Sequence, residues 1–278
     1  MHVQPDPAQQ VEVRRGADRF VTRAAQITAW HSFSFGPHYD PGNVGFGCLR
    51  VHNEELVAAG AGYDDHEHRD TEIVTWVLDG ALRHVDSTGH RGVLQPGTVQ
   101  VMSAGDGVVH AERNADPDPG GRPVRFVQMW LAAAEPDEFG EPVGAADAAG
   151  AQTPRYQQRD ASAALAGGGW VLLASGLDHR GPGGPAGPAD LPRLRGVPAA
   201  LHAARPAPGA RLAVPAAPSA HLFLARGTAT LGATSPVELR PGDAVRLTGA
   251  GSARLTAGPD GAEVLVWEMH PQPRAVRP

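Results

Sequence analysis

Glycine and proline interrupt this chain so often that long helices cannot dominate its fold. They contribute 35 and 26 of the 278 residues, and both weaken helices, glycine through its backbone entropy and proline through its missing N–H. We therefore expect many short strands joined by turns. Hydrophobic residues make up 41% of the chain and charged residues 19%. This balance supports a buried core and excludes a wholly disordered chain.

Turn signals at regular intervals divide the first half of the chain into short apolar segments. Residues 71–78 are rich in β-branched side chains and stop at Asp79-Gly80, a strong hairpin signal, so residues 81–86 are expected as the return strand. Further strands are expected at residues 98–102, 108–112 and 124–131. Strands about ten residues apart predict an all-β antiparallel sandwich or barrel.

The same order of strands and turns occurs twice. A glycine turn followed by a Pro-Gly turn appears as Gly80 with Pro96-Gly97, and again as Gly227 with Pro241-Gly242. Two similar β domains are therefore expected. The predicted segments are a flexible tail over residues 1–13, an N-terminal domain over 14–132, a linker over 133–160 and a C-terminal domain over 161–278, with a Gly/Pro-rich loop at 181–192.

Charge and apolar content narrow the partners and the location. The net charge is −6, which disfavours general nucleic-acid binding because that affinity depends on cations at the phosphates. No apolar stretch approaches the ~20 residues of a membrane span. The lone Cys48 cannot form an internal disulfide, and the N-terminus lacks the apolar core of a signal peptide. We expect a soluble cytoplasmic protein without a direct nucleic-acid or membrane partner.

Histidine is the most informative residue type in the first half. Eight of the 13 histidines fall between His31 and His110. Side chains two apart on a strand share a face, so His66 projects with His68, and His110 with Glu112. Two such pairs on neighbouring strands can close on one divalent ion, iron, manganese, nickel, copper or zinc, with one or two positions left open.

Other interpretations of these residues remain open from spacing alone. Glu72 lies four residues after His68 and is a competing ligand. Each pair taken singly is more often polar surface or a hydrogen-bonded pair at a strand end, because short motifs match by chance. The remaining first-half histidines have weaker support: His31, His38 and His84 are expected in a pocket or in packing. A surface position is expected for His2, His90, His179 and His270.

Several longer motifs resemble a known family. Residues 60–80 (GAGYDDHEHRDTEIVTWVLDG), Pro96-Gly97 and residues 110–114 (HAERN) resemble the two motifs of the cupin superfamily. Five further motifs resemble the N-terminal domain of pirin and its bacterial relatives. They are HSFSF at 31–35, YDP at 39–41, LRV at 49–51, HVDS at 84–87 and MSAG at 102–105. Residues 153–159 (TPRYQQR) resemble the pirin inter-domain segment.

The resemblance implies a bicupin, two double-stranded β-helix barrels with one metal centre in the N-terminal barrel. The implied ligands are His66, His68, His110 and Glu112, and the implied metal is iron(II), with nickel, manganese, copper, cobalt and zinc as alternatives. Glu72 matches a ligand of other cupins but not of pirins, so it ranks as a neighbour of the metal. The C-terminal half lacks His-X-His and His-X-Glu and is expected to be metal-free.

The resemblance also implies a function. Pirin-like bicupins are associated with quercetin 2,3-dioxygenase activity, in which dioxygen cleaves a flavonol with loss of carbon monoxide. A small aromatic substrate and dioxygen would then be the partners, and Glu112 would be both ligand and catalytic base. The expected apolar walls of the pocket are Phe33, Phe35, Phe46, Trp76 and Met102.

Two alternative functions remain open. One is an iron-binding regulatory or redox-sensing protein that acts through a protein partner without turnover. The other is a cupin enzyme acting on sugars or acids, for which polar pocket walls are expected.

Overall fold

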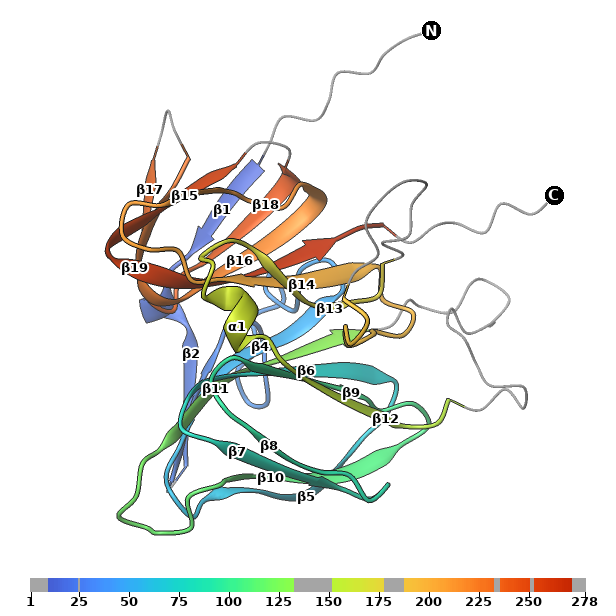
Figure 1. The fold of residues 1–278 in the computed structure, drawn as a ribbon. Helices are drawn as coiled ribbons and strands as arrows, with labels where there is room; N and C mark the ends of the chain where they lie inside the picture. Colours follow the sequence, from blue (N-terminus) through green and yellow to red (C-terminus); the bar gives the residue numbers. More distant parts are fainter. Residues whose placement is uncertain are drawn as a thin grey trace, which may run out of the picture. The chain divides into compact units, whose positions relative to one another are not determined.

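The computed structural model describes residues 10–24, 26–132, 152–177, 188–232, 236–250 and 253–271 (Figure 1). This described part is almost entirely β, with one short helix, α1 (Ser162–Leu165), and a 3-10 turn at Gly16–Asp18. The predicted all-β class is confirmed. None of its helices is long and apolar enough to cross a membrane.

The chain divides into two compact units. The N-terminal unit consists of Arg19–Ala164 and Leu173–Val197. The C-terminal unit takes the described parts of Met1–Asp18, Leu165–Leu172 and Pro198–Pro278. Each unit has its own hydrophobic cluster of strand residues.

The N-terminal unit is built from two antiparallel sheets (Figure 1). The strands of the larger sheet are β2 (Phe20–Ala24), β3 (Ile27–His31), β4 (Leu49–Val57), β6 (Thr71–Asp79), β9 (Thr98–Ser103), β11 (Val124–Ala132) and β12 (Arg155–Asp160). They run in the order β12-β9-β6-β11-β4-β3-β2. The smaller sheet contains β5 (Gly62–His68), β7 (Leu82–Asp86), β8 (Arg91–Leu94) and β10 (Val108–Asn114), in the order β5-β10-β7-β8.

The turn at Asp79-Gly80 has a different role from the one expected. The strands on its two sides do not pair with each other: β6 pairs with β9 and β11, whereas β7 pairs with β8 and β10. Gly80, at φ 73°, carries the chain from the larger sheet to the smaller one. A hairpin prediction from the dipeptide was therefore wrong, because a Gly turn also suits a corner between two sheets.

The interior of this unit is arranged in layers. Cross-strand partners share a face, so the register places Gln128, Thr75 and Gln100 in one polar row across the larger sheet. On one side of this row lies an apolar cluster that includes Val77 and Phe126. On the other lies the cluster of Ile73, Met102, Ala104 and Val108, against which Trp130 packs. A polar layer thus crosses the core between two apolar layers.

The C-terminal unit contains one eight-stranded sheet. Its strands are β1 (Gln10–Arg14), β13 (Val171–Ser175), β14 (Ala199–Ala204), β15 (Arg211–Ala213), β16 (Ala217–Leu231), β17 (Val237–Leu239), β18 (Ala244–Ala250) and β19 (Arg254–Met269). The main path is β1-β18-β16-β19-β14-β13, with β15 on β19 and β17 on β16. The boundary between the two units falls within β13, after Leu172.

Two expected segments differ from the structure at their ends. Residues 10–13, expected in the tail, belong to β1, whose backbone pairs with β18 from Gln10↔Thr248 to Arg14↔Ala244. Residues 155–160, expected in the linker, form β12 on the edge of β9. Both segments are polar edge strands whose partners lie far away in sequence, so composition alone resembles a tail or a linker. Residues 1–9, 133–151 and 178–187 lie outside the described residues.

Candidate metal centre

Two neighbouring strands carry the four predicted ligands. β5 carries His66 and His68, β10 carries His110 and Glu112, and His110 pairs directly with His66. Ligand atoms of His66, His68 and His110 all lie within 4.8 Å of one another. Glu112 lies within the same limit of His110 and His84, in a second group that shares His110.

A β-bulge sets the direction of these side chains. His110 pairs with His66, but Glu112 pairs with Tyr63, so β5 holds one extra residue between these two pairs. Within this stretch the carbonyl oxygen of Asp64 lies 2.8 Å from Nδ1 of His66 and accepts its hydrogen bond. Nδ1 of His66 is therefore the protonated nitrogen, and Nε2 keeps the lone pair that can bind a metal.

Three of the predicted ligand atoms are buried without a hydrogen-bond partner. They are Nε2 of His68, Nε2 of His110 and Oε1 of Glu112. Leaving one buried polar atom unpaired costs about 1–3 kcal/mol, so unpartnered atoms on three residues of the two linked ligand groups point to a common partner. A divalent cation binds neutral imidazole nitrogens and a carboxylate oxygen together, and these residues therefore fit a metal ion.

His84 lies close enough to His110 and Glu112 to be a ligand, but its ring nitrogens are already engaged in hydrogen bonds. Its Nε2 lies 3.2 Å from Oδ2 of Asp86, and its Nδ1 lies 3.4 Å from Nδ1 of His110. Both nitrogens are thus occupied, and Oδ1 of Asp86 accepts further bonds from Thr88. His84, expected as a pocket or packing residue, orients the His110 ring so that Nε2 faces the other ligands.

The protonation states suit metal binding. Burial lowers the pKa of His68 to about 4 and that of His110 to about 2, with neighbouring histidines acting in the same direction. Both rings are therefore neutral at pH 7. Burial raises the pKa of Glu112 to about 7, against the opposing effect of its hydrogen bond from Gln128.

Gln128 and Trp130 hold the carboxylate of Glu112. Nε2 of Gln128 donates to Oε2 of Glu112 at 2.7 Å, and Nε1 of Trp130 donates to Oε1 of Gln128 at 3.0 Å. Because an indole N–H only donates, it fixes which end of the Gln128 amide faces Glu112. Neither residue is predicted as functional from the sequence, although their alternation along a buried strand was a usable signal.

Two predictions beside the ligands can be compared with the structure. Glu72 belongs to neither ligand group of the described residues, and its Oε2 accepts a hydrogen bond from Ser103 at 2.8 Å. Glu67 is exposed and pairs with Arg69 at 2.6 Å. It therefore points away from the ligands, as the strand alternation predicts.

A cavity of about 240 Å³ opens beside the ligands and includes His66 and Glu112 in its wall. Of the five predicted wall residues only Phe35 lines it; Phe33, Trp76 and Met102 are buried in the core, and Phe46 is not part of the wall. The aromatic wall is instead completed by His31, Tyr63 and Trp130. Exposure of these rings depends on sheet closure, which local sequence does not reveal.

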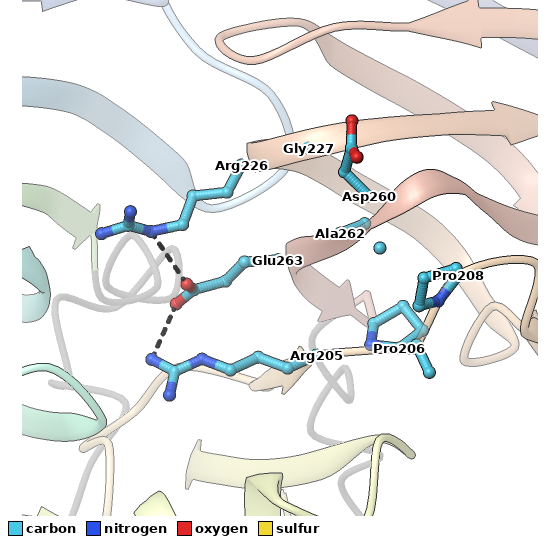
Figure 2. A pocket seen from close by; sticks show the side chains of 10 residues that line it. Arg205, Pro206, Pro208, Arg226, Gly227, Asp260, Ala262 and Glu263 are labelled. Carbon is cyan, nitrogen blue, oxygen red and sulfur yellow. Dashed lines mark hydrogen bonds and ion pairs between the residues drawn. The ribbon is translucent and has the colours of Figure 1, made fainter.

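The C-terminal unit has a depression of about 270 Å³ (Figure 2). Its buried Glu263 lies between two arginines, with Nη2 of Arg205 at 3.1 Å from Oε1 and Nε of Arg226 at 3.2 Å from Oε2 (Figure 2). The two guanidinium groups thus share one carboxylate, and these ion pairs connect the residues that line the depression. Among the described residues, the two groups of side chains that could hold a metal ion both lie in the N-terminal unit.

Two named bacterial proteins are similar in sequence to this chain. A Mycobacterium tuberculosis protein named "putative quercetin 2,3-dioxygenase" is 46% identical over 260 residues, covering 94% of this chain and 95% of that protein. The Escherichia coli quercetin 2,3-dioxygenase is 37% identical over 149 residues, covering 54% and 57% of the two chains.

A solved structure and a family model complete the comparison. The structure of the bacterial pirin YhhW from Escherichia coli in complex with nickel(II) matches with a TM-score of 0.76 and 25% identity, covering 95% of this chain and all of that one. The model of the Pirin family matches residues 12–131. The predicted family and bicupin fold are confirmed, and the chain belongs to the pirin family.

Proposed function

We propose that this protein is a metal-dependent dioxygenase of the quercetin 2,3-dioxygenase type, which cleaves the ring of a flavonol or a related aromatic. The proposed metal ligands are His66, His68, His110 and Glu112. This proposal depends mainly on the buried, unpartnered atoms of His68, His110 and Glu112, and on the cavity with aromatic rings in its wall that Glu112 and His66 also line. The names of the relatives support the reaction class.

The chain's own residues supply positioning and proton transfer. A divalent metal, when bound, supplies an open coordination position that lowers the cost of forming the substrate anion. Gln128 occupies Oε2 of Glu112, so Oε1 is the oxygen left for the metal and for the proton of the substrate hydroxyl. We propose Glu112 as the catalytic base through this oxygen. Trp130 and Phe35 exclude water from the cavity and flank a flat ring.

Iron(II) in a cytoplasmic setting is part of the proposal. A lone Cys48 suits a reducing compartment, and His/Glu donors accept iron(II) as well as nickel, manganese, copper, cobalt or zinc. Metal analysis of protein isolated from its own host checks this assignment. Iron as the main metal is the expected result.

The Glu112→Gln variant tests the proposed function. It is expected to abolish oxygen uptake with a flavonol while largely keeping the fold, because it removes the charged ligand and base. The matched control is Glu72→Gln, which changes another buried glutamate that belongs to neither ligand group. Unchanged turnover in Glu112→Gln contradicts the assignment.

The alternative is a metal-binding regulatory protein without turnover, because the same four ligands serve it equally well. The cavity at the ligands favours the enzyme, since a regulator has no need of an aromatic-lined chamber beside its metal. Metal binding without oxygen consumption for any hydroxylated aromatic is the result that favours the regulator.

A further inference from the structure

A second carboxylate faces the same cavity and has no role in the proposed metal centre. Glu55 on β4 is 5% exposed, lines the cavity together with Glu112, and belongs to neither ligand group. No arginine is among the described residues that line this cavity, and the chain contains no lysine. A metal bound at the candidate ligands would compensate the charge of Glu112, whereas the described wall residues include no arginine or lysine that could do the same for Glu55.

The neighbouring Glu54 is a buried carboxylate with a structural role, and it serves as a comparison for Glu55. Glu54 is also 5% exposed, yet its side chain points to the opposite face of the strand. There it pairs with Arg19 at 2.9 Å and with Arg125 at 2.6 Å. Glu55 forms no such ion pair with any residue that the structure describes, so ion pairing within this part of the chain does not explain its burial.

Hydrogen-bond donors converge on Glu55 from one side. The hydroxyl of Tyr63 donates to Oε2 at 2.5 Å, and the side chain of Asn53 adds a hydrogen bond. Oδ1 of Asn53 lies 3.0 Å from Nδ1 of His31, whose Nε2 lies 2.8 Å from the hydroxyl of Thr22. His31 therefore donates to Asn53, and this leaves the Asn53 amide N–H groups for Glu55. The chain of hydrogen bonds from Thr22 through His31 and Asn53 therefore ends at the carboxylate of Glu55, which accepts.

The carboxylate has acceptor capacity left. A carboxylate offers about four lone-pair positions, and the two donors use two of them. Burial raises the pKa of Glu55 to about 7, opposed by the bonds from Tyr63 and Asn53, and Glu112 is the other carboxyl in the wall. An anionic ligand group would be repelled here, whereas a hydroxyl can donate to the charged form and accept from the neutral form.

The rings of the wall define the rest of the ligand. His31 stacks on Phe35 with centroids 5.0 Å apart, and Phe35 meets Trp130 edge-on at 5.6 Å. We propose that Glu55 is a specificity-determining residue that accepts a hydrogen bond from a phenolic hydroxyl of the ligand, away from the metal. This rests on the proposed function in taking the ligand as a hydroxylated aromatic.

The test compares ligand binding in variants at Glu55 with the neighbouring glutamate as control. Nickel(II)-loaded protein kept without oxygen is titrated with quercetin and with its fully O-methylated analogue. The wild type is expected to prefer quercetin, and Glu55→Met to reduce this preference about ten- to a hundredfold, as for loss of a hydrogen bond to a charged group. Glu55→Gln, which keeps a neutral acceptor, is expected to fall between them.

Controls separate this inference from the proposed function. Glu54→Gln is expected to lower thermal stability without changing the preference, and nickel titration of Glu55→Met to match the wild type. An unchanged preference in Glu55→Met overturns the role of Glu55 even if oxygen uptake is present. Binding of neither compound by the wild type also overturns it. A Glu55-dependent preference without oxygen uptake in iron-loaded wild type keeps this inference and rejects the dioxygenase.

Discussion

The two oxygens of Glu112 meet different surroundings, and this difference gives the residue its chemistry. Oε2 accepts from Gln128, whereas Oε1 is buried without a partner. If Oε2 were protonated, its O–H would face the amide N–H of Gln128, and two donors would oppose each other. The Gln128 amide is held against turning its oxygen toward Glu112, because that oxygen accepts the hydrogen bond from the indole N–H of Trp130. Gln128 is thus a positioning residue for the proposed ligand.

Substitution of Gln128 by leucine is expected to weaken metal affinity by about ten- to a hundredfold, because lost support of a ligand has effects of this size. Competition with a chelator measures the affinity. Gln100→Leu is the matched control, since Gln100 is fully buried in the same polar row but its amide has no hydrogen-bond partner among the described residues, whereas that of Gln128 bonds to Glu112. Equal losses in both variants would show that the effect is general core damage.

At the scale of elements, the contact between β5 and β10 sets the ligand geometry. Gly62 lies where the backbone of β10 leaves no room for a side chain: an added Cβ would be 2.5 Å from Cα of Arg113 and closer still to the carbonyl oxygen of Glu112. The bulge and this glycine together let the two strands stay close beside the candidate ligands that they carry.

The Gly62→Ala variant is expected to push β5 away from β10 at the ligands. Overpacking of this kind costs about 1–3 kcal/mol of unfolding free energy, and metal affinity should fall with it. Thermal unfolding and chelator competition measure the two effects. Gly120→Ala is the control, because its nearest atom would be Oδ1 of Asp118 at 3.6 Å. Wild-type metal affinity in Gly62→Ala would refute the close-contact argument.

At the scale of the whole molecule, both units contain buried histidines, but among the described residues only those of the N-terminal unit belong to a candidate metal-binding group. In the N-terminal unit burial keeps the candidate ligands His68 and His110 neutral. In the C-terminal unit His221 on β16 is 1% exposed, and burial together with Arg246 lowers its pKa to about 3. This histidine belongs to no metal-binding group of the described residues.

Acid is therefore expected to act on stability through His221. The unfolded chain binds a proton near pH 6.5, whereas the folded chain does not until about pH 3, so stability is lost as pH falls between these values. Urea unfolding of the wild type and of His221→Leu in the same metal state measures this. The stability difference, wild type minus variant, should decrease from pH 6.5 toward pH 3. A difference independent of pH contradicts the prediction.

The candidate ligands and the fold class could be predicted from the sequence for a local reason. The period of two along a strand places His66 with His68 and His110 with Glu112, whatever the rest of the chain does. The Gly and Pro turns likewise predicted short strands in the segments that became β6, β9, β10 and β11. The direction of the turn at Gly80 was not accessible, because pairing depends on partners far along the chain.

What the sequence by itself determined is thus the family, the all-β class and the residue types at the candidate metal centre. Only the tertiary structure decided that Gln128 supports Glu112, that His84 supports His110 and that Glu55 faces the cavity with Tyr63. The physical reason is that alternation along a strand is a local property of the backbone. Contacts between strands depend on register and sheet closure, which arise only when distant segments pair.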